Sequence, residues 1–318
     1  MEVQELAKIS NNILDAVGKV IVGKRLVLRR VFAAILAQGH ILMEDYPGLA
    51  KTLLANCFAQ VLTIGFARIQ FTPDLLPGDI TGSTIYNQQK SNFEFARGPI
   101  FNHLLLADEV NRATPKTQSA LLEAMQEHQV TVEGVAHPLE PPFLVFATQN
   151  PIEFEGTYPL PEAQLDRFIQ RVAVGYPTED EEVEILDRRQ GRKTDDISLT
   201  SVVDRNELLS MQSCIEEVHV DREAIRYIVR IVQETRKDHR VQVGASPRGA
   251  LALFKLARAE AAIDGRDFVT PEDVKAVALG ALAHRLILKP EYWARGESEE
   301  DVTREVLDRV PTPETLEK

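Results

Sequence analysis

HILMEDYPGLAKT, at residues 40–52, is the stretch that decides the fold. An apolar strand over residues 40–44 runs into a short turn, and a helix then begins at the pair Lys51–Thr52. Proteins that hold a nucleoside triphosphate use this arrangement, because backbone N–H groups of the turn and of the helix N-terminus surround the phosphates. Lys51 can reach the outer phosphates, and the hydroxyl of Thr52 can bind Mg²⁺.

The turn departs from the phosphate-loop pattern G-x-x-x-x-G-K-[ST]. The first glycine of the pattern falls on Asp45 and the second on Ala50, so that only Gly48 remains in the middle of the loop. An alanine in the left-handed region costs about 1 kcal/mol relative to glycine. We therefore expect weaker or slower nucleotide use, not loss of the site. By itself the segment fits either a phosphate loop or an ordinary strand-to-helix turn.

Size and composition predict two soluble domains. The chain has 318 residues, of which 44% are hydrophobic and 26% charged. Its net charge of −12 argues against broad binding to nucleic acid, so we expect no specific nucleic-acid partner. The N-terminus is polar, no apolar run is long enough to span a membrane, and Cys57 and Cys214 give no disulfide framework. These features predict a cytoplasmic protein without direct membrane insertion.

Apolar runs alternate with helical patterns in the first part of the chain. Such runs are typical of a parallel sheet that helices cover on both faces. The expected strands are residues 40–44, 67–71, 104–107, 143–148 and 168–174. They predict an α/β domain over residues 1–176. Two segments interrupt the alternation, at residues 84–95 and 129–143, and we expect them to form hairpins that project from the domain.

The pattern becomes helical throughout after residue 176. Ser246–Pro247, for example, pairs an N-cap residue with proline at the first helical position. We therefore expect an all-helical lid domain at residues 177–290. An acidic tail follows at residues 291–318, which we expect to be partly helical and peripheral.

Two adjacent carboxylates, Asp108 and Glu109, end the apolar run at residues 104–107. Asp108 at the strand tip can hold Mg²⁺ through its water shell, and Glu109 can polarise a water for attack on the γ-phosphate. Acidic residues are also common at solvated strand ends. The occurrence of Lys51–Thr52 in the same domain favours the catalytic interpretation.

Three further polar residues are candidates for the same site. Asn150 follows an apolar strand, so its amide lies at the edge where open α/β sheets bind ligands, although Asn-Pro also favours turns. Arg167 precedes the last strand and is either a solvated side chain or an arginine finger for a neighbouring subunit. Arg248 lies in the first turn of a lid helix, where a cation opposes the helix dipole unless it has an anionic partner such as a phosphate.

These residues belong to motifs through which the chain resembles the MoxR family of AAA+ ATPases, over about residues 10–290. The motifs are FTPDLLPGDITG (71–82), GPIF (98–101), LADEVNRA (106–113), KTQSALLEAM (116–125), ATQNP (147–151), LDRF (165–168) and SPRG (246–249). The resemblance implies an AAA+ P-loop NTPase with a five-stranded parallel sheet and an all-helical lid. It also implies ATP and Mg²⁺ as ligands.

The resemblance assigns roles to individual positions. Residues 45–52 become the Walker A loop, Asp108–Glu109 the Walker B pair, Asn150 sensor 1, Arg167 the arginine finger and Arg248 sensor 2. The implied catalytic residues are Lys51, Glu109, Asn150, Arg167 and Arg248, and the implied magnesium ligands are Thr52 and Asp108. The implied nucleotide-binding residues are Val22 and Gly23, against the adenine, and Asp45, Tyr46, Pro47, Gly48, Leu49, Ala50, Lys51, Thr52, Leu53, Asp108, Asn150 and Arg248. Arg112 is a candidate to act across a subunit interface.

The leading functional hypothesis is an oligomeric ATPase that remodels or helps to assemble other proteins. The resemblance implies a hexameric ring with ATP between subunits. It also implies protein clients, among them proteins with a von Willebrand factor A domain. In this hypothesis Arg167 and Arg248 sense the γ-phosphate from opposite sides of the site. The alternatives are an ATP-binding scaffold with little hydrolysis and the motor subunit of a metal-chelatase-like complex. A transcription activator is disfavoured because the sequence shows no helix-turn-helix pattern.

Overall fold

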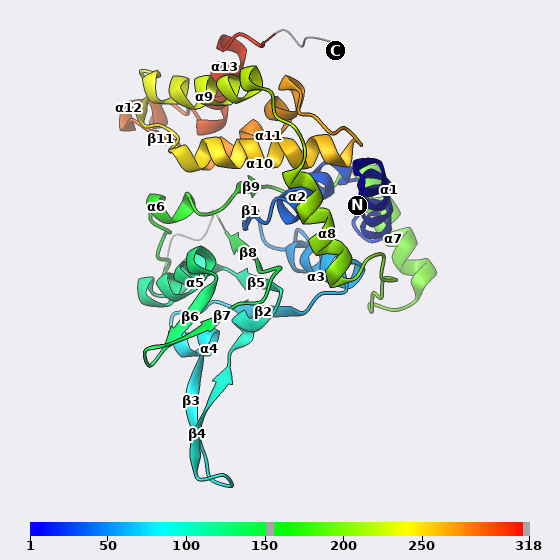
Figure 1. Ribbon diagram of the computed structural model, residues 1–318, viewed down its shortest axis with the longest axis vertical. Helices are drawn as coiled ribbons and strands as arrows, with labels where there is room; N and C mark the ends of the chain where they lie inside the picture. Colours follow the sequence, from blue (N-terminus) through cyan, green and yellow to red (C-terminus); the bar gives the residue numbers. More distant parts are fainter. Residues whose placement is uncertain (151–155, 314–318) are drawn as a thin grey trace.

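Five parallel strands form the central sheet, as the apolar runs predicted, and their order is β2-β5-β8-β1-β9 (Figure 1). The strands are β1 (Ile41–Glu44), β2 (Phe66–Gln70), β5 (Leu104–Asp108), β8 (Leu144–Gln149) and β9 (Gln170–Val172). The computed structural model describes residues 1–150 and 156–313. Pro151, which belongs to one of the motifs above, and residues 314–318 of the predicted tail lie outside the described residues.

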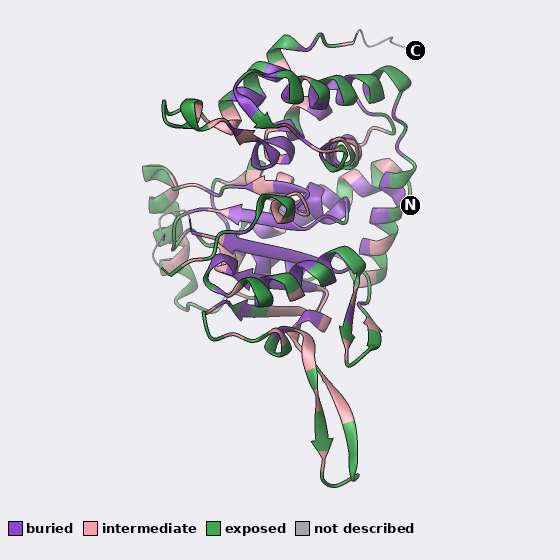
Figure 2. Cartoon of the chain, turned by 90° about the vertical axis from the view of Figure 1, so that its left-hand side faces the viewer, coloured by how far each residue is buried: buried purple, intermediate pink, exposed green. Residues whose placement is uncertain are grey.

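Successive residues of the central strands point into two different apolar clusters. Leu104, Leu106 and Phe146 belong to the larger cluster, whereas Leu105 and Val145 belong to the smaller one. Side chains alternate across a strand, so a continuous apolar run needs cover on both faces. Figure 2 shows these strands as a buried layer inside the molecule.

Helices cover both faces of the sheet. The helices whose buried residues belong to the larger cluster are α1 (Val3–Gly18), α2 (Arg25–Leu36) and α3 (Lys51–Val61). Those that contribute to the smaller cluster are α4 (Pro77–Thr81), the 3₁₀ turns η1 (Pro99–Phe101) and η2 (Val110–Arg112), and α5 (Pro115–Glu127). A short helix, α6 (Glu162–Leu165), precedes β9. The carboxyl ends of the strands therefore meet at one edge of a covered sheet.

Both predicted hairpins are present. They are formed by β3 (Gly82–Asn87) with β4 (Asn92–Arg97) and by β6 (Gln129–Val132) with β7 (Val135–Pro138). The β3–β4 hairpin extends away from the lid and is the longest projection in Figure 1. The rings of Phe95 and His137 stack with centroids 4.0 Å apart, and Thr84 Oγ1 donates to Glu133 Oε2 at 3.0 Å. These contacts hold the two hairpins side by side.

The C-terminal part of the chain forms the lid. Its helices are α7 (Glu179–Arg192), α8 (Arg205–Glu216), α9 (Arg222–Lys237), α10 (Pro247–Ile263), α11 (Pro271–Leu282), the 3₁₀ turn η3 (Ala283–Arg285), α12 (Pro290–Trp293) and α13 (Glu299–Arg309). The predicted cap of α10 is present, because Ser246 Oγ accepts the N–H of Arg248 at 3.0 Å. The lid also contains a short antiparallel ladder, β10 (Val241–Val243) with β11 (Ile287–Leu288), which the helical patterns did not indicate.

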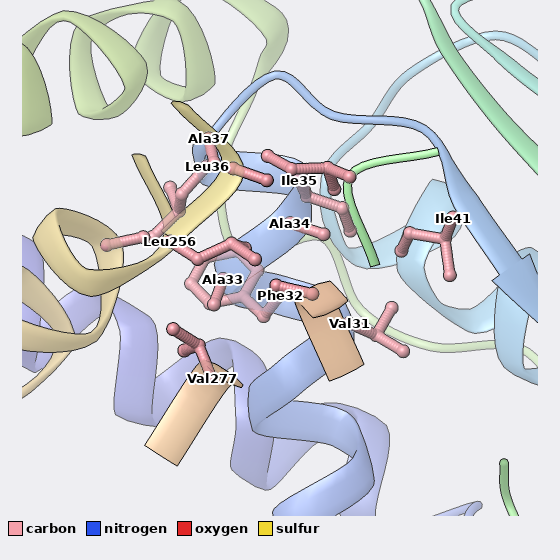
Figure 3. Packing of buried hydrophobic residues seen from close by; sticks show 14 of the residues in the cluster. Val31, Phe32, Ala33, Ala34, Ile35, Leu36, Ala37, Ile41, Leu256 and Val277 are labelled. Atoms are coloured by element: carbon pink, nitrogen blue, oxygen red, sulfur yellow. The ribbon is translucent and has the colours of Figure 1, made fainter. Parts of the chain in front are cut away.

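The lid shares its apolar core with the N-terminal helices. Leu256 of α10 and Val277 of α11 pack with the buried residues at the end of α2, among them Phe32 and Leu36 (Figure 3). All four side chains are at most 2% exposed. Their burial removes apolar surface from water and joins the lid to the α/β body through one continuous cluster.

The expectation of a peripheral tail is wrong for residues 299–309. Val302 and Val306 of α13 are fully buried against α9 and α11. Arg309 Nη2 also donates to the carboxylate of Asp238 at 3.0 Å. The i, i+4 spacing of the two valines places them on one helix face. The segment is rich in charged residues, so its overall composition did not indicate a buried face. Among the described residues, no helix is both long and apolar enough to cross a membrane.

A buried histidine links β1 to its neighbours and makes stability depend on pH. His40 Nδ1 accepts the N–H of Val145 at 3.0 Å, and Nε2 lies 3.1 Å from the carbonyl oxygen of Met125, to which it donates. Burial lowers the pKa of His40 to about 4. The unfolded chain binds this proton near pH 6.5 and the folded chain does not. The stabilisation is complete above that pH and is lost as the pH falls from about 6.5 towards 4.

We therefore expect the free energy of unfolding to fall by about 2 kcal/mol between pH 7 and about pH 5 through His40 alone. Denaturant titrations at the two pH values measure this change. In His40→Asn, where the amide oxygen can still accept the Val145 N–H, the pH dependence should be smaller. An unchanged pH dependence in that variant would show that His40 is not responsible.

Candidate nucleotide-binding site

The predicted phosphate loop connects the carboxyl end of β1 to α3. Gly48 has φ +84° and Ala50 has φ +54°, so both residues adopt the left-handed conformation. Tyr46, Pro47, Gly48 and Ala50 are exposed, Leu49 is buried, and Thr52 and Leu53 in the first turn of α3 are half-buried. The loop therefore presents backbone to solvent at a helix N-terminus, as an anion-binding loop requires.

The alanine at position 50 is strained, as the sequence predicted. Replacing it by glycine should relieve about 1 kcal/mol and raise the melting temperature of the nucleotide-free protein by about 2 °C. Thermal unfolding measures this. Ala59→Gly, within α3, should have the opposite effect, because glycine in a helix interior is destabilising. A lower melting temperature for Ala50→Gly would contradict the assignment of strain to this residue.

Lys51 lies close to the acidic groups of the sheet edge. Its Nζ donates to the carbonyl oxygen of Asp45 at 2.7 Å. Burial lowers the pKa of the Lys51 ammonium, and the carboxylates of Asp45, Asp108 and Glu109 oppose that shift. The structure thus brings the predicted lysine and both strand-end carboxylates into one electrostatic environment.

Asp45, which replaces the first glycine of the motif, anchors the loop. Its carboxylate accepts the backbone N–H groups of Val174 and Gly175, the latter at 3.0 Å. Asp45 is 7% exposed, so these are buried, charge-assisted hydrogen bonds. The residue therefore ties the start of the phosphate loop to the segment that leads from β9 to the lid.

The oxygen atoms of Asp108 are both engaged. Thr148 Oγ1 donates to Oδ1 at 2.6 Å, and Arg68 donates to Oδ2 through Nη2 at 2.7 Å and through Nε at 3.1 Å. Thr148 and Arg68 come from β8 and β2, the two neighbours of β5 in the sheet. The sequence analysis missed both residues, although Thr148 ends a predicted strand and Arg68 lies within another.

Glu109 is held at the same edge. It has φ +56°, its N–H donates to Thr148 Oγ1 at 2.8 Å, and its Oε2 accepts from Gln70 Nε2 at 2.8 Å. Arg112 Nη1 lies 3.2 Å from the same oxygen. Asn150, which follows β8, is buried at 7% exposure. Gln70 is a further residue that the sequence analysis missed, and its place at the end of β2 is the signal that identifies it.

A magnesium ion fits this edge only together with other ligands. Among the described residues no group of three His, Cys, Asp or Glu side chains could hold a metal. One carboxylate and one hydroxyl, Asp108 and Thr52, suit Mg²⁺ because that ion usually keeps several waters and binds substrate phosphates. Arg68 occupies one Asp108 oxygen, so this guanidinium would have to move for the ion to bind there.

The two predicted arginines lie elsewhere. Arg167 and Arg248 line one pocket of about 240 Å³ together with Gly39 and His40, which precede β1, and Met125 of α5. Arg167 Nη1 donates to the carbonyl oxygen of Leu122 at 2.6 Å, and its buried Nε has no hydrogen-bond partner among the described residues. Because residues that precede β1 line the pocket, it lies at the amino edge of the sheet, whereas the phosphate loop lies at the carboxyl edge.

Asp166 joins the two arginine-bearing segments. Its carboxylate accepts from Ser246 Oγ at 2.9 Å and 3.1 Å and forms an ion pair with Arg285. These contacts fix the N-terminus of α10 beside the segment that carries Arg167. Arg167 and Arg248 line the same pocket of one chain, and their action on the γ-phosphate from opposite sides stays a prediction. Helix propensities and motifs gave no information on how the lid is docked.

Val22 and Gly23, predicted to contact adenine, lie near the start of the loop. Val22 is buried at 5% exposure, and Gly23 has φ +70°. The following residue, Lys24, donates through Nζ to the carbonyl oxygen of Tyr176 at 2.8 Å. The ring of Tyr176 lies 5.7 Å from that of Tyr46, in the phosphate loop. The segment between α1 and α2 is therefore linked to the phosphate loop by Tyr176, which contacts both.

A parallel sheet with a phosphate loop after β1, two carboxylates at the end of β5 on the other side of β8, and a helical lid defines an AAA+ P-loop fold. The profile of the ATPase family associated with various cellular activities (AAA) matches residues 40–170, and that of the AAA lid domain matches residues 233–306. The chain belongs to the MoxR family of AAA+ ATPases.

Individual relatives support this assignment. The protein YeaC of Bacillus subtilis is 45% identical over 98% of this chain and 97% of its own length. Chaperone MoxR1 of Mycobacterium tuberculosis is 43% identical over 94% of this chain and 81% of its own length. The crystal structure of a putative ATPase from Cytophaga hutchinsonii superposes with a TM-score of 0.92 at 42% identity and covers 98% of this chain and 97% of its own. Similarity to the magnesium-chelatase 38 kDa subunit of Acidiphilium rubrum is more distant, at 32% identity over 58% of this chain.

Proposed function

We propose that this protein hydrolyses ATP at the interfaces of a homo-oligomeric ring, with six subunits, and uses the energy to remodel or assemble partner proteins. One observation carries the proposal. Lys51, Asp108 and Glu109 lie at the carboxyl edge of the sheet, whereas Arg167 and Arg248 line a pocket at its amino edge. A site that uses all five residues therefore needs two copies of the chain.

The residues divide the work between two subunits. In one subunit Lys51 holds the outer phosphates, Thr52 and Asp108 hold Mg²⁺, and Asn150 orients the water that Glu109 activates. Bound Mg²⁺ would neutralise charge on the phosphates. The other subunit inserts Arg167, and Arg248 beside it, to stabilise the charge that develops on the γ-phosphate.

Charge complementarity supports the contact between copies. The first turn of α7 carries the exposed acids Glu179, Asp180 and Glu182, and α7 begins beside the nucleotide edge. The pocket at the other edge is lined by Arg167, Arg248 and Lys255, and by Arg285, whose charge is paired with Asp166 in the same lining. Patches of opposite charge on two edges of one chain favour a head-to-tail contact between copies. Such a contact closes into a ring when the rotation between adjacent subunits permits it.

The hairpins are the proposed client-contacting elements. Ile85, Tyr86 and Phe93 on the β3–β4 hairpin are 53%, 52% and 72% exposed. Exposed apolar side chains on a projecting element favour contact with another protein. The name of the relative MoxR1, a chaperone, agrees with protein clients, and we propose partners with a von Willebrand factor A domain among them. The two free, buried cysteines, Cys57 and Cys214, agree with a cytoplasmic location.

Two other functions remain as alternatives. The strain at Ala50 is the observation that favours an ATP-binding scaffold with little hydrolysis. The alternative of a chelatase-like motor is supported here only by the distant similarity to the magnesium-chelatase subunit.

Steady-state phosphate release, measured over a range of protein concentrations, tests the proposed function. Because each site needs two chains, the rate per chain should rise with concentration and then reach a plateau. Absence of phosphate release at every concentration, with ATP bound, would favour the scaffold. A rate per chain that does not change on dilution to monomers, verified by sedimentation, would contradict the shared site.

A further inference from the structure

Three segments, residues 23–24, the phosphate loop at Tyr46 and residues 176–181, meet and form one wall. Lys24 Nζ donates to the carbonyl oxygen of Tyr176 at 2.8 Å and lies 3.2 Å from Glu181 Oε2. The ring of Tyr46 lies against that of Tyr176, and these rings are 43% and 64% exposed. Exposed aromatic faces beside a phosphate loop are suitable for stacking against a nucleobase.

The carboxylate of Glu181 is fixed in this wall. Its Oε2 accepts the N–H of Thr178 at 2.9 Å, and this hydrogen bond caps α7. The same oxygen also faces Lys24 Nζ. Its Oε1 lies directly against Gly23, where an added Cβ would be only 1.8 Å from that oxygen. A side chain at position 23 would displace the carboxylate of Glu181 from this place. The helix cap accounts for the position of Oε2 but not for the placement of Oε1 on the bare backbone of Gly23.

The environment keeps this carboxylate ionised. The hydrogen bond from the backbone N–H of Thr178 lowers the pKa of Glu181, burial opposes this shift, and Lys24 lowers the pKa further. An ionised carboxylate can only accept hydrogen bonds. Glu181 therefore presents one acceptor without a protein donor named above, Oε1, against Gly23 in the wall that also carries the two rings.

We propose that Glu181 accepts a hydrogen bond from the 6-amino group of adenine and so makes the site selective for ATP over GTP. This proposal rests on the proposed nucleotide function. Adenine carries an N–H donor at position 6, where guanine carries a carbonyl acceptor. Oε1 of Glu181 attracts the first and repels the second. A carboxylate that reads the two adjacent donors of guanine needs both oxygens, and here Thr178 and Lys24 already occupy Oε2.

Equilibrium binding of ATP and GTP, measured by calorimetry in the full chain, tests the proposal without relying on turnover. Glu181→Gln is the informative variant, because glutamine at this position preserves the capping box of α7. The wild type should prefer ATP, and the variant should reduce that preference about tenfold, since a neutral amide can donate as well as accept. Asp187→Asn makes the same charge change at an exposed position further along α7 and should leave the ratio unchanged.

A second ligand makes the same test on the unmodified protein. Purine riboside triphosphate lacks the 6-amino group, so the wild type should bind it about tenfold more weakly than ATP, and Glu181→Gln should show a smaller difference. The proposal is overturned if Glu181→Gln retains the wild-type ratio of ATP to GTP affinity, or if the wild type binds purine riboside triphosphate as tightly as ATP. Equal affinity for ATP and GTP overturns this inference alone. Absence of binding to any nucleotide overturns the proposed function as well.

Discussion

Glu109→Gln should lower the steady-state rate of ATP hydrolysis by about 10²- to 10⁴-fold, the usual contribution of a general base. Glutamine has the same shape but cannot take a proton from water. The backbone of Glu109 should keep its position, because its N–H donates to Thr148 Oγ1 at 2.8 Å. ATP binding should be retained, since the phosphates are held by Lys51 and the loop. Phosphate release and calorimetric ATP binding measure the two effects separately.

Glu123→Gln is the matched control for this variant. Glu123 is exposed on α5 and carries the same side chain, so its replacement should leave turnover unchanged. If Glu109→Gln hydrolysed ATP at the wild-type rate, Glu109 would not be the base, and the contacts of its carboxylate with Gln70 and Arg112 would be structural only.

Arg167→Ala should have the second large effect. We expect turnover to fall by about 10³-fold or more, because an arginine supplied to a γ-phosphate contributes roughly 10³ to 10⁵. Within its own chain Arg167 Nη1 donates to the carbonyl oxygen of Leu122, and its buried Nε has no hydrogen-bond partner among the described residues. The variant should therefore fold and bind ATP with nearly unchanged affinity. Phosphate release and calorimetry again separate the two effects.

Arg248→Ala provides the comparison. Because Arg248 lines the same pocket as Arg167, an equal mixture of the two alanine variants should remain slow. Each interface in that mixture receives its arginines from one subunit, which lacks one of them. Recovery of turnover would show that Arg248 acts on the nucleotide of its own chain. Wild-type turnover in Arg167→Ala alone would refute the finger assignment.

The strands and the helix starts were predictable from the sequence because their signals are local. The apolar run at residues 104–107 is a buried strand, and the serine–proline pair at residues 246–247 begins a helix. The hairpins were predictable for the same reason, since each interrupts an otherwise regular alternation.

The contacts that complete the site were not predictable, because they join segments far apart in the chain. Thr148, Arg68 and Gln70 contact the carboxylates only through the strand order of the sheet. The placement of Arg248 beside Arg167 depends on how the lid docks, which the ion pair of Arg285 with Asp166 helps to fix. The buried face of α13 was also not predicted, because most residues of this helix are charged.

Mixing Glu109→Gln with Arg167→Ala subunits tests the shared site most directly. Each variant alone should be nearly inactive. In a mixed ring about one interface in four combines an intact Glu109 with an intact Arg167 from the neighbouring subunit. Phosphate release should therefore rise well above that of either variant, with a maximum near equal proportions. If mixed oligomers form, as verified by sedimentation of differently labelled subunits, and no mixing ratio restores phosphate release, the two edges do not build one site.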